Sequence, residues 1–347
     1  MRKHLNMSGL LLILVLLITA CSGNGTGKTA GENTASGPAK EIVYDKETGL
    51  LFDYLAETGD YVNSRDFPSL INADALYESL GENTLVIDLR DSDTYREGHI
   101  EGAVNVSFSD IPDYFENEIK AYQYDKIVMC CYSGQMSSYT TALLRLMGYG
   151  NVYSLRWGMS VWNHDIYNNN PWIDHVSSDF TDKLEQSENA KPEAGSFPGL
   201  ATGLETGEEI LNARIRQLFA EGFDDVWTNT EEATNDSADY FIINYDRKDK
   251  YESGHLPGAV RYKPNGMLGI PDEMITIPAE QDVAVYCGTG HSSAFVTAYL
   301  RLFGYNAHSI TYGNNRFMHD KMLEEENTLS WPVFTEDLVN DFPYVKE

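Results

Sequence analysis

Two stretches of this chain, Val128-Met-Cys-Cys-Tyr-Ser-Gly-Gln-Met-Ser-Ser138 and Val285-Tyr-Cys-Gly-Thr-Gly-His-Ser-Ser293, place a cysteine in the same pattern. Cys131 and Cys287 lie 156 residues apart. That period is too long for a solenoid repeat, which recurs every ~20–50 residues. The chain therefore contains a duplicated domain, and each copy carries its own cysteine loop.

A second pair of stretches repeats at the same offset. Tyr95-Arg-Glu-Gly-His-Ile-Glu-Gly-Ala-Val104 matches Tyr251-Glu-Ser-Gly-His-Leu-Pro-Gly-Ala-Val260, so that His99 pairs with His255. At roughly 100–200 residues per domain, a chain of 347 residues holds two domains. We expect a signal peptide at 1–20, a flexible tether at 21–42, a first domain at 43–180, a linker at 181–207, a second domain at 208–335 and a tail at 336–347, with the two domains folding separately.

The first residues have the features of a bacterial export signal. A basic start at Arg2 and Lys3 precedes an apolar run from Leu10 to Ile18. That run is shorter than the ~20 residues that span a bilayer. Ile18-Thr-Ala-Cys21 resembles a lipobox, which predicts lipidation at Cys21 and a protein anchored to the bacterial cell membrane, facing outside the cytoplasm. The alternatives are an ordinary signal peptide or a short membrane anchor.

The composition excludes some partners. The net charge of −28 becomes −30 once Arg2 and Lys3 are removed with the signal peptide. Such an acidic chain is not expected to bind nucleic acid, or anionic lipid through charge, so the lipid would be the only membrane contact. The chain has only four cysteines, too few for a disulfide framework, and the thiols at the loops therefore favour a reactive role.

The apolar periodicity predicts alternating helices and strands. Such alternation is typical of an α/β fold in which each domain has a mainly parallel sheet with helices on both faces. We expect helices at 50–62, 73–80, 137–147, 210–226 and 292–303, and strands at 84–89, 103–106, 126–131, 152–155, 240–245, 259–262, 282–287 and 307–311.

Each loop cysteine is expected at the carboxyl end of a strand, just before a helix. Backbone N–H groups of the loop and the helix N-terminus would stabilise a thiolate there, so that the pKa of Cys131 and of Cys287 should fall. The alternative is a buried structural cysteine. Cys130 points to the other side of the strand and is interpreted as a core residue, with a resolving thiol as the alternative.

These features resemble the rhodanese-like family. The resemblance lies in Asp88-Leu-Arg90 with Gly98-His-Ile-Glu-Gly-Ala103, in the Cys-x-x-Gly loops, and in Gly158-Met-Ser-Val-Trp162. It covers about 45–180 and 205–335. It implies two rhodanese-like domains in tandem and a sulfurtransferase that moves sulfane sulfur through cysteine persulfides, without a cofactor or a metal. The implied partners are a sulfur donor and a thiol or other nucleophilic acceptor.

The resemblance also assigns site residues. Cys131 and Cys287 would be the nucleophiles. Asp88 and Arg90 would support the site. His99 and His255 lie on a loop between strands and are interpreted as hydrogen-bonded structural residues that support the site, with catalytic bases as the alternative. The persulfide or anion would lie in the two loops, cradled by the amides of residues 133–135 and 289–291. The loop residues are Tyr132, Ser133, Gly134, Gln135, Met136, Ser137, Gly288, Thr289, Gly290, His291 and Ser292.

Several positions depart from the family pattern. Met136 and Ser292 stand where many members have arginine, so thiosulfate is not expected to be the preferred donor. In the second repeat Asn244 and Asp246 replace the Asp-x-Arg pair. His291 could hold the Cys287 thiolate as an ion pair, and Arg156 is a candidate cation near Cys131.

Two other function classes stay open at this point. The domains could be non-catalytic modules that bind an anion or a partner protein, and the neutral loops favour this alternative. Phosphatase or arsenate chemistry would need an arginine clamp for the oxyanion, which neither loop has.

Overall fold

A computed structural model describes residues 44–347 except 168, 236–239, 266–267, 269–272 and 326–330. Residues 42–347 form one compact unit. The signal peptide at 1–20, the lipidation site at Cys21 and the tether at 21–42 lie outside the described residues. Among the helices of the described part, none is both long and apolar enough to cross a membrane.

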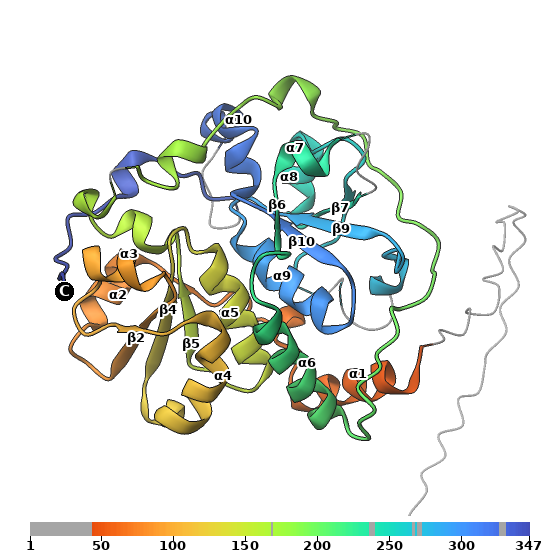
Figure 1. Cartoon of the computed structure of the whole chain (residues 1–347). Helices are drawn as coiled ribbons and strands as arrows, with labels where there is room; N and C mark the ends of the chain where they lie inside the picture. Colours follow the sequence, from red (N-terminus) through yellow and green to blue (C-terminus); the bar gives the residue numbers. More distant parts are fainter. Residues whose placement is uncertain (1–43, 168, 236–239, 266–267, 269–272, 326–330) are drawn as a thin grey trace, which may run out of the picture. The chain divides into compact units, whose positions relative to one another are not determined.

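Each repeat builds a five-stranded sheet in which all neighbouring strands are parallel, as predicted (Figure 1). Helices flank both sheets, which confirms the predicted α/β class. The first sheet has the order β1-β5-β4-β2-β3, with β1 (Leu70–Ile71), β2 (Thr84–Asp88), β3 (Val104–Asn105), β4 (Lys126–Cys130) and β5 (Val152–Leu155). The second has the order β6-β10-β9-β7-β8, with β6 (Trp227–Thr228), β7 (Tyr240–Asn244), β8 (Val260–Arg261), β9 (Asp282–Tyr286) and β10 (Ala307–Ile310).

Four helices recur in the same order in both repeats, whereas the helices at Ile111–Asp113 and His319–Glu324 match none of the described α-helices of the other repeat. In the first repeat they are α1 (Lys46–Thr58), α2 (Ala73–Ser79), α3 (Ser92–Glu97), α4 (Ile111–Asp113) and α5 (Gln135–Leu146). In the second they are α6 (Gly207–Glu221), α7 (Thr230–Ala233), α8 (Lys248–Ser253), α9 (His291–Leu302) and α10 (His319–Glu324).

The predicted limits of the first helix are wrong by four residues. The Asp45 carboxylate accepts hydrogen bonds from the N–H groups of Glu47 and Thr48, so α1 begins at Lys46. Gly59 ends it at a φ of 119°, a value that favours glycine. The helix predicted at 210–226 likewise begins and ends early, because Thr206 caps α6 and Gly222 has a φ of 78°.

Both faces of each sheet are buried, as expected for parallel strands. On β4, Ile127 and Met129 belong to the core shared with α5, whereas Val128 and Cys130 pack into a separate cluster on the opposite face. Cys131, the next residue, lies on the same face as Ile127 and Met129. Cys130 is therefore a core residue that points away from the loop, as predicted.

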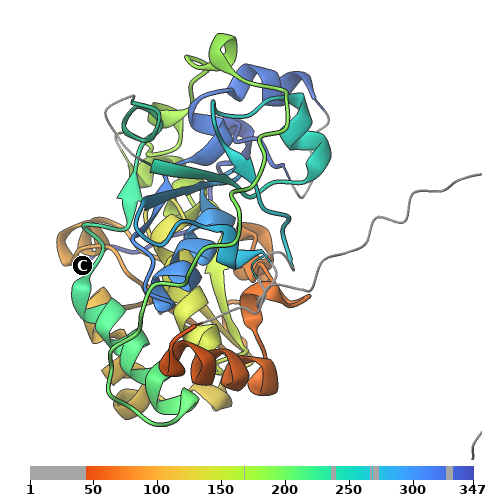
Figure 2. The same cartoon turned by 90° about the vertical axis from the view of Figure 1, so that its right-hand side faces the viewer.

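The two repeats share one hydrophobic core. α5 and α9 pack against each other between the sheets (Figure 1), and Tyr139 and Phe295 belong to the same buried cluster. α1 lies beside α6 (Figures 1 and 2), and Phe52 stacks on Phe303 with ring centroids 4.4 Å apart. The two expected domains therefore share buried side chains, and their separate folding stays a prediction.

Each repeat also pairs with the segment that follows the other repeat. His255 exchanges two backbone hydrogen bonds of 2.9 Å with Glu185, which follows the first repeat. His99 exchanges equivalent bonds of 3.0 and 2.9 Å with Val345, which follows the second. One residue of the expected linker and one of the expected tail thus form isolated antiparallel bridges with the opposite repeats.

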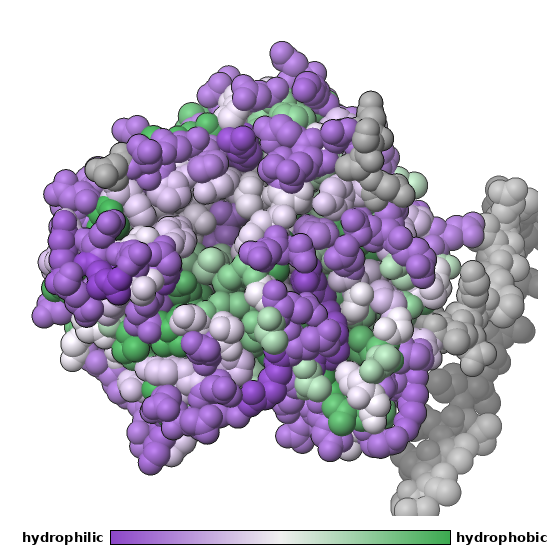
Figure 3. All heavy atoms as spheres, viewed as in Figure 1, coloured by the Kyte–Doolittle hydropathy of each residue, from purple (hydrophilic) through white to green (hydrophobic). Residues whose placement is uncertain are grey.

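Side chains at the surface fit the acidic composition. Hydrophilic side chains cover most of the face in Figure 3, and apolar side chains appear between them in patches. Several ion pairs join two exposed groups, such as Arg216 with Glu116, and such pairs contribute at most about 1 kcal/mol each.

Candidate active site

The two cysteine loops have nearly the same backbone. Cys131 and Cys287 directly follow β4 and β9, and α5 and α9 begin four residues later. Gly134 and Gly290 precede these helices with φ values of 88° and 79°, in the left-handed region. A Cβ on Gly134 would lie 2.4 Å from Nε2 of His291, so this loop also needs glycine for space.

Backbone N–H groups point at each sulfur. Sγ of Cys131 accepts hydrogen bonds from the N–H groups of Gly134 at 3.2 Å and Ser137 at 3.3 Å. Sγ of Cys287 accepts one from the N–H of Ser293 at 3.3 Å. The converging amides therefore exist. The amide of Gly134 is one of those expected, whereas Ser137 and Ser293, in the first turn of each helix, lie two positions beyond the expected ranges.

The hydroxyl groups of these serines continue the network. The Ser137 hydroxyl lies 3.4 Å from Sγ of Cys131 and 2.8 Å from the Ser154 hydroxyl. The Ser293 hydroxyl makes the equivalent contact of 2.8 Å with Ser309. Ser293 was not among the predicted site residues, although its match to Ser137 in the repeat was a signal that could have identified it.

The predicted fall of the cysteine pKa values is wrong. Burial raises the pKa of the Cys131 thiol, and the hydrogen bonds from Ser137 and Gly134 only reduce that rise. Burial and the nearby Asp246 carboxylate raise the pKa of Cys287. Both side chains are almost inaccessible, with 1% and 3% exposure, so loss of water outweighs the amide dipoles.

The Asp88-Leu-Arg90 motif forms a buried ion pair. Nη2 of Arg90 donates to Oδ2 of Asp88 at 2.6 Å and to the carbonyl of Gly98 at 2.7 Å. The pair thus fixes the loop that carries His99. His99 and His255 each bond through Nδ1 to a backbone carbonyl at 2.8 Å, which makes them structural supports as predicted.

The second repeat replaces this pair with a buried carboxyl group. Asp246 is 3% exposed and accepts hydrogen bonds from the N–H of Gly288 at 3.1 Å and from Nδ2 of Asn314 at 3.0 Å. Burial raises the pKa of Asp246 to about 7, although these hydrogen bonds act to lower it. Asp246 therefore holds the start of the Cys287 loop, a role that the sequence alone did not indicate.

His291 does not pair with the Cys287 thiolate, which corrects the earlier expectation. Its Nδ1 lies 2.7 Å from the Thr289 hydroxyl, and its Nε2 lies 3.2 Å from the N–H of Trp157 and 3.1 Å from the carbonyl of Ser133. Burial and the Arg156 charge lower the pKa of His291 to about 3. The ring is a neutral bridge between the two cysteine loops.

Gln135 makes the reciprocal bridge. It occupies the position of His291 in the first repeat, and its Oε1 accepts a hydrogen bond of 2.7 Å from the N–H of Tyr312 in the second. His291 thus reaches the Cys131 loop of the first repeat, and Gln135 reaches Tyr312, which follows β10 of the second repeat.

Met136 and Ser292, the two positions without arginine, have different surroundings. Met136 is partly buried against the shared core, as a gap-filling residue would be. Ser292 lines a cavity together with Cys287. The Tyr132 hydroxyl bonds to the Asp91 carboxylate, which fixes that side of the first loop.

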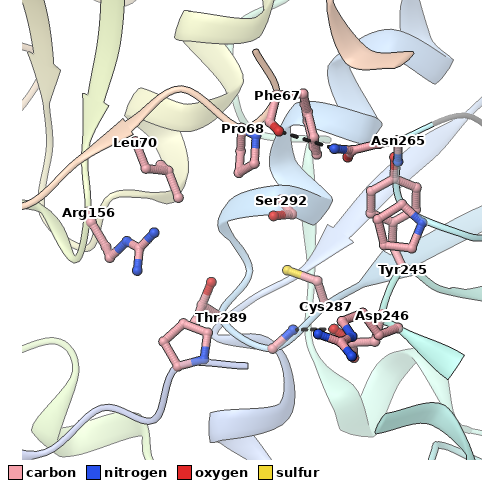
Figure 4. Close-up of a pocket in the computed structure, with 14 residues that line it drawn as sticks. Phe67, Pro68, Leu70, Arg156, Tyr245, Asp246, Asn265, Cys287, Thr289 and Ser292 are labelled. Atoms are coloured by element: carbon pink, nitrogen blue, oxygen red, sulfur yellow. Dashed lines mark hydrogen bonds between the residues drawn. The ribbon is translucent and has the colours of Figure 1, made fainter. Parts of the chain in front are cut away.

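The cavity at Cys287 is built from both repeats. It has a volume of about 410 Å³, and Figure 4 shows the Cys287 sulfur directed into it, opposite Phe67, Pro68 and Leu70 of the first repeat. Arg156, which was expected near Cys131, lines this cavity at Cys287. The other lining residues are Tyr245, Asp246, Arg247, Pro264, Asn265, Gly288, Thr289, Ser292 and Pro332.

Aromatic side chains surround the first cysteine loop. Trp172 is fully buried and donates a hydrogen bond of 3.0 Å from Nε1 to the carbonyl of Ser133. Its ring contacts Tyr312 edge-on, with centroids 4.9 Å apart. Cys131 is thus buried beside an aromatic cluster, whereas Cys287 lines a cavity.

Comparison with known proteins agrees with this geometry. The family model described as "Rhodanese-like domain" matches residues 72–165 and 226–320, more than half of the chain. The chain belongs to the rhodanese-like family. This match confirms the predicted tandem arrangement, with one cysteine loop inside each matched segment.

The curated relatives carry two kinds of name. The thiosulfate sulfurtransferase GlpE of Pseudomonas fluorescens is 37% identical over 92 residues, which are 26% of this chain and 78% of the relative. The tRNA uridine(34) hydroxylase of Brucella canis is 28% identical over 176 residues, 44% of this chain. The chain spans about half the length of that hydroxylase (54%). A solved rhodanese-related protein from Thermoplasma volcanium is 24% identical, with a TM-score of 0.23, over 26% of this chain and 84% of that one.

Proposed function

We propose that this protein is a sulfurtransferase in which Cys287 carries sulfane sulfur as a persulfide. The observation that carries the proposal is the position of the Cys287 sulfur, which faces a cavity of about 410 Å³ and accepts a hydrogen bond from the first turn of α9. The membership in the rhodanese-like family and the similarity to a thiosulfate sulfurtransferase support the same chemistry.

The proposed reaction has two steps. The Cys287 sulfur attacks the outer sulfur of a donor R–S–S⁻, the S–S bond of the donor breaks, and the thiol proton leaves with R–SH. An acceptor thiolate then attacks the outer sulfur of the cysteine persulfide and regenerates the Cys287 thiolate. No cofactor takes part, and the partners are the donor and a thiol or other nucleophilic acceptor.

Cys131 has the same loop geometry but a closed environment. Burial among aromatic side chains would restrict access of donors, so we propose that Cys131 accepts sulfur more slowly than Cys287.

The two sites can be separated by mass spectrometry after incubation with an alkyl persulfide. The Cys131→Ser variant should keep an adduct of one sulfur atom on Cys287, and Cys287→Ser should lose most of the adduct. The absence of an adduct on Cys287 would refute the proposal. If the protein formed no adduct but still bound anions or proteins, the alternative of a non-catalytic binding module would be favoured.

Thiosulfate is proposed to be a poor donor. Ser292 lines the cavity where many family members have arginine, and Asp246 lines the same cavity with a carboxyl group. A dianion would therefore lack an arginine partner on the cysteine loop itself and would meet a partly negative site.

We do not propose a role on RNA. The name of the Brucella relative ties that protein to tRNA, but the chain studied here has a net charge of −28, which opposes binding to phosphate backbones.

We also propose that a lipid on Cys21 anchors the protein to the bacterial cell membrane, outside the cytoplasm. The basic start, the short apolar run and Ile18-Thr-Ala-Cys21 support this location. Replacing Cys21 by Ser should move the protein from the membrane fraction to the soluble fraction. A variant that stays with the membrane would refute the lipid anchor.

A further inference from the structure

Arg156 is a cation at the wall of the Cys287 cavity. It directly follows β5 of the first repeat, and its Nε is buried with no hydrogen-bond partner among the described residues. Burial lowers its pKa, and no carboxylate of the described part opposes that effect. A guanidinium in such a place gains most from an anion that arrives from outside.

The second arginine at the cavity differs in this respect. Nε of Arg247 lies 3.1 Å from Oδ1 of Asp249, and 61% of its side chain is exposed. Arg247 thus already has a counter-ion, whereas the guanidinium of Arg156 points into the cavity from the first repeat (Figure 4).

The rest of the cavity indicates what kind of anion fits. Phe67, Pro68 and Leu70 form an apolar wall across from Cys287, and Tyr245 and Pro332 add to it. A volume of about 410 Å³ is within the range of ~300–1,000 Å³ for small organic ligands. An inorganic dianion would leave this apolar surface uncovered.

We propose that Arg156, supplied by the first repeat, binds the anionic group of the sulfur donor that Cys287 of the second repeat attacks, and that this donor is an organic monoanion with an apolar body. The inference rests on the sulfurtransferase function proposed above. Residues of both repeats would then form the active site, because Arg156 of the first repeat takes the place of the arginine that the Cys287 loop lacks.

An arene thiosulfonate, Ar–SO₂–S⁻, has these properties and serves as the probe. The Cys287 sulfur would attack its outer sulfur, and the bond between that sulfur and the sulfonyl sulfur would break. The products are the cysteine persulfide, which keeps the thiol proton, and the sulfinate Ar–SO₂⁻. Arg156 would hold the sulfonyl oxygens, on which negative charge collects in the leaving sulfinate.

Binding tests the anion site without any sulfur transfer. Benzenesulfonate and the neutral benzenesulfonamide have similar shapes, and calorimetry on the full chain should find the anion bound about tenfold more tightly. Arg156→Met should remove that preference, and Arg156→Lys should keep part of it. The control Arg96→Met removes one exposed charge elsewhere and should leave the preference unchanged. A preference that survives Arg156→Met would overturn the assignment.

Turnover tests the link to Cys287. In a Cys131→Ser background, Arg156→Met should lower kcat/KM for benzenethiosulfonate about tenfold and leave kcat/KM for a neutral dialkyl trisulfide unchanged. Equal losses for both donors would overturn the inference. A parent that binds benzenesulfonate through Arg156 but transfers no sulfur from either donor would refute the proposed function and leave the anion site standing.

Discussion

Replacing Asp246 by Asn should change how the stability of this protein depends on pH. Asp246 has a pKa of about 7 in the folded protein, against 3.8 for an ordinary aspartate, because burial disfavours its charged form. Below pH 3.8 the group is protonated in both the folded and the unfolded chain. Between these two values the unfolded chain releases the proton while the folded chain retains it, so the free energy of unfolding decreases as the pH rises.

The size of the effect follows from the two pKa values. Each pH unit is worth about 1.4 kcal/mol, so the interval from 3.8 to about 7 corresponds to a loss on the order of 4 kcal/mol. Asparagine does not titrate, but its amide group can no longer accept from both Gly288 and Asn314. That loss costs about 1–3 kcal/mol at every pH. The variant should therefore be less stable than the parent near pH 4 and of equal or higher stability near pH 8.

Urea unfolding at a series of pH values provides the assay. The difference between variant and parent cancels the titration of all other groups, and it should rise between pH 4 and 7 and level off above. Asp88→Asn is the matched contrast in the first repeat. It leaves the buried Arg90 without its carboxylate and should destabilise by about 3–5 kcal/mol. A difference between Asp246→Asn and parent that stays flat, or falls as the pH rises, would refute the reasoning.

Three further predictions concern the cysteine loops. Ser292→Arg in a Cys131→Ser chain should raise thiosulfate turnover about tenfold, because it places a guanidinium beside Cys287. A variant that is folded by circular dichroism and has unchanged turnover would contradict this. Gly290→Ala should lower the free energy of unfolding by about 2–3 kcal/mol, because the new Cβ would lie 2.4 Å from a side chain of the other repeat. Gly81→Ala is the control: its φ is 83° but the space around it is open, so it should lower the free energy of unfolding by only about 1–2 kcal/mol. Equal losses for the two variants in urea titrations would count against the steric argument. His291→Gln should leave the shape of the pH profile of sulfur transfer between pH 5 and 8 unchanged, since the pKa of His291 is about 3; a profile that loses an inflection would show that the ring titrates during turnover.

The sequence predicted the parts of the fold that depend on neighbouring residues. The central strands are continuous buried runs, and the Cys131 and Cys287 loops follow them with glycine at matching places, so both could be located from the pattern alone. The edge strands Leu70–Ile71 and Trp227–Thr228 are two residues long, which is too short for any periodicity to appear. Their place in the sheets is decided by pairing with β5 and β10.

The site was less predictable because its properties arise between the repeats. The amides that point at the sulfur favour a lower cysteine pKa, but burial by side chains distant in the sequence decides the direction. The orientation of His291 toward Ser133 and the position of Arg156 at the Cys287 cavity depend on how α5 packs on α9. No local motif contains that information.

The exchanged segments give this chain the symmetry of a dimer. Glu185 pairs with His255 in the same way that Val345 pairs with His99, which is the pattern of two identical subunits that exchange their C-terminal segments. In an isologous dimer the two contacts would be identical by symmetry. Within one chain the two halves need not be identical: the titratable carboxyl of Asp246 lies near Cys287, whereas Arg90, at the matching position of the first repeat, belongs to a buried ion pair.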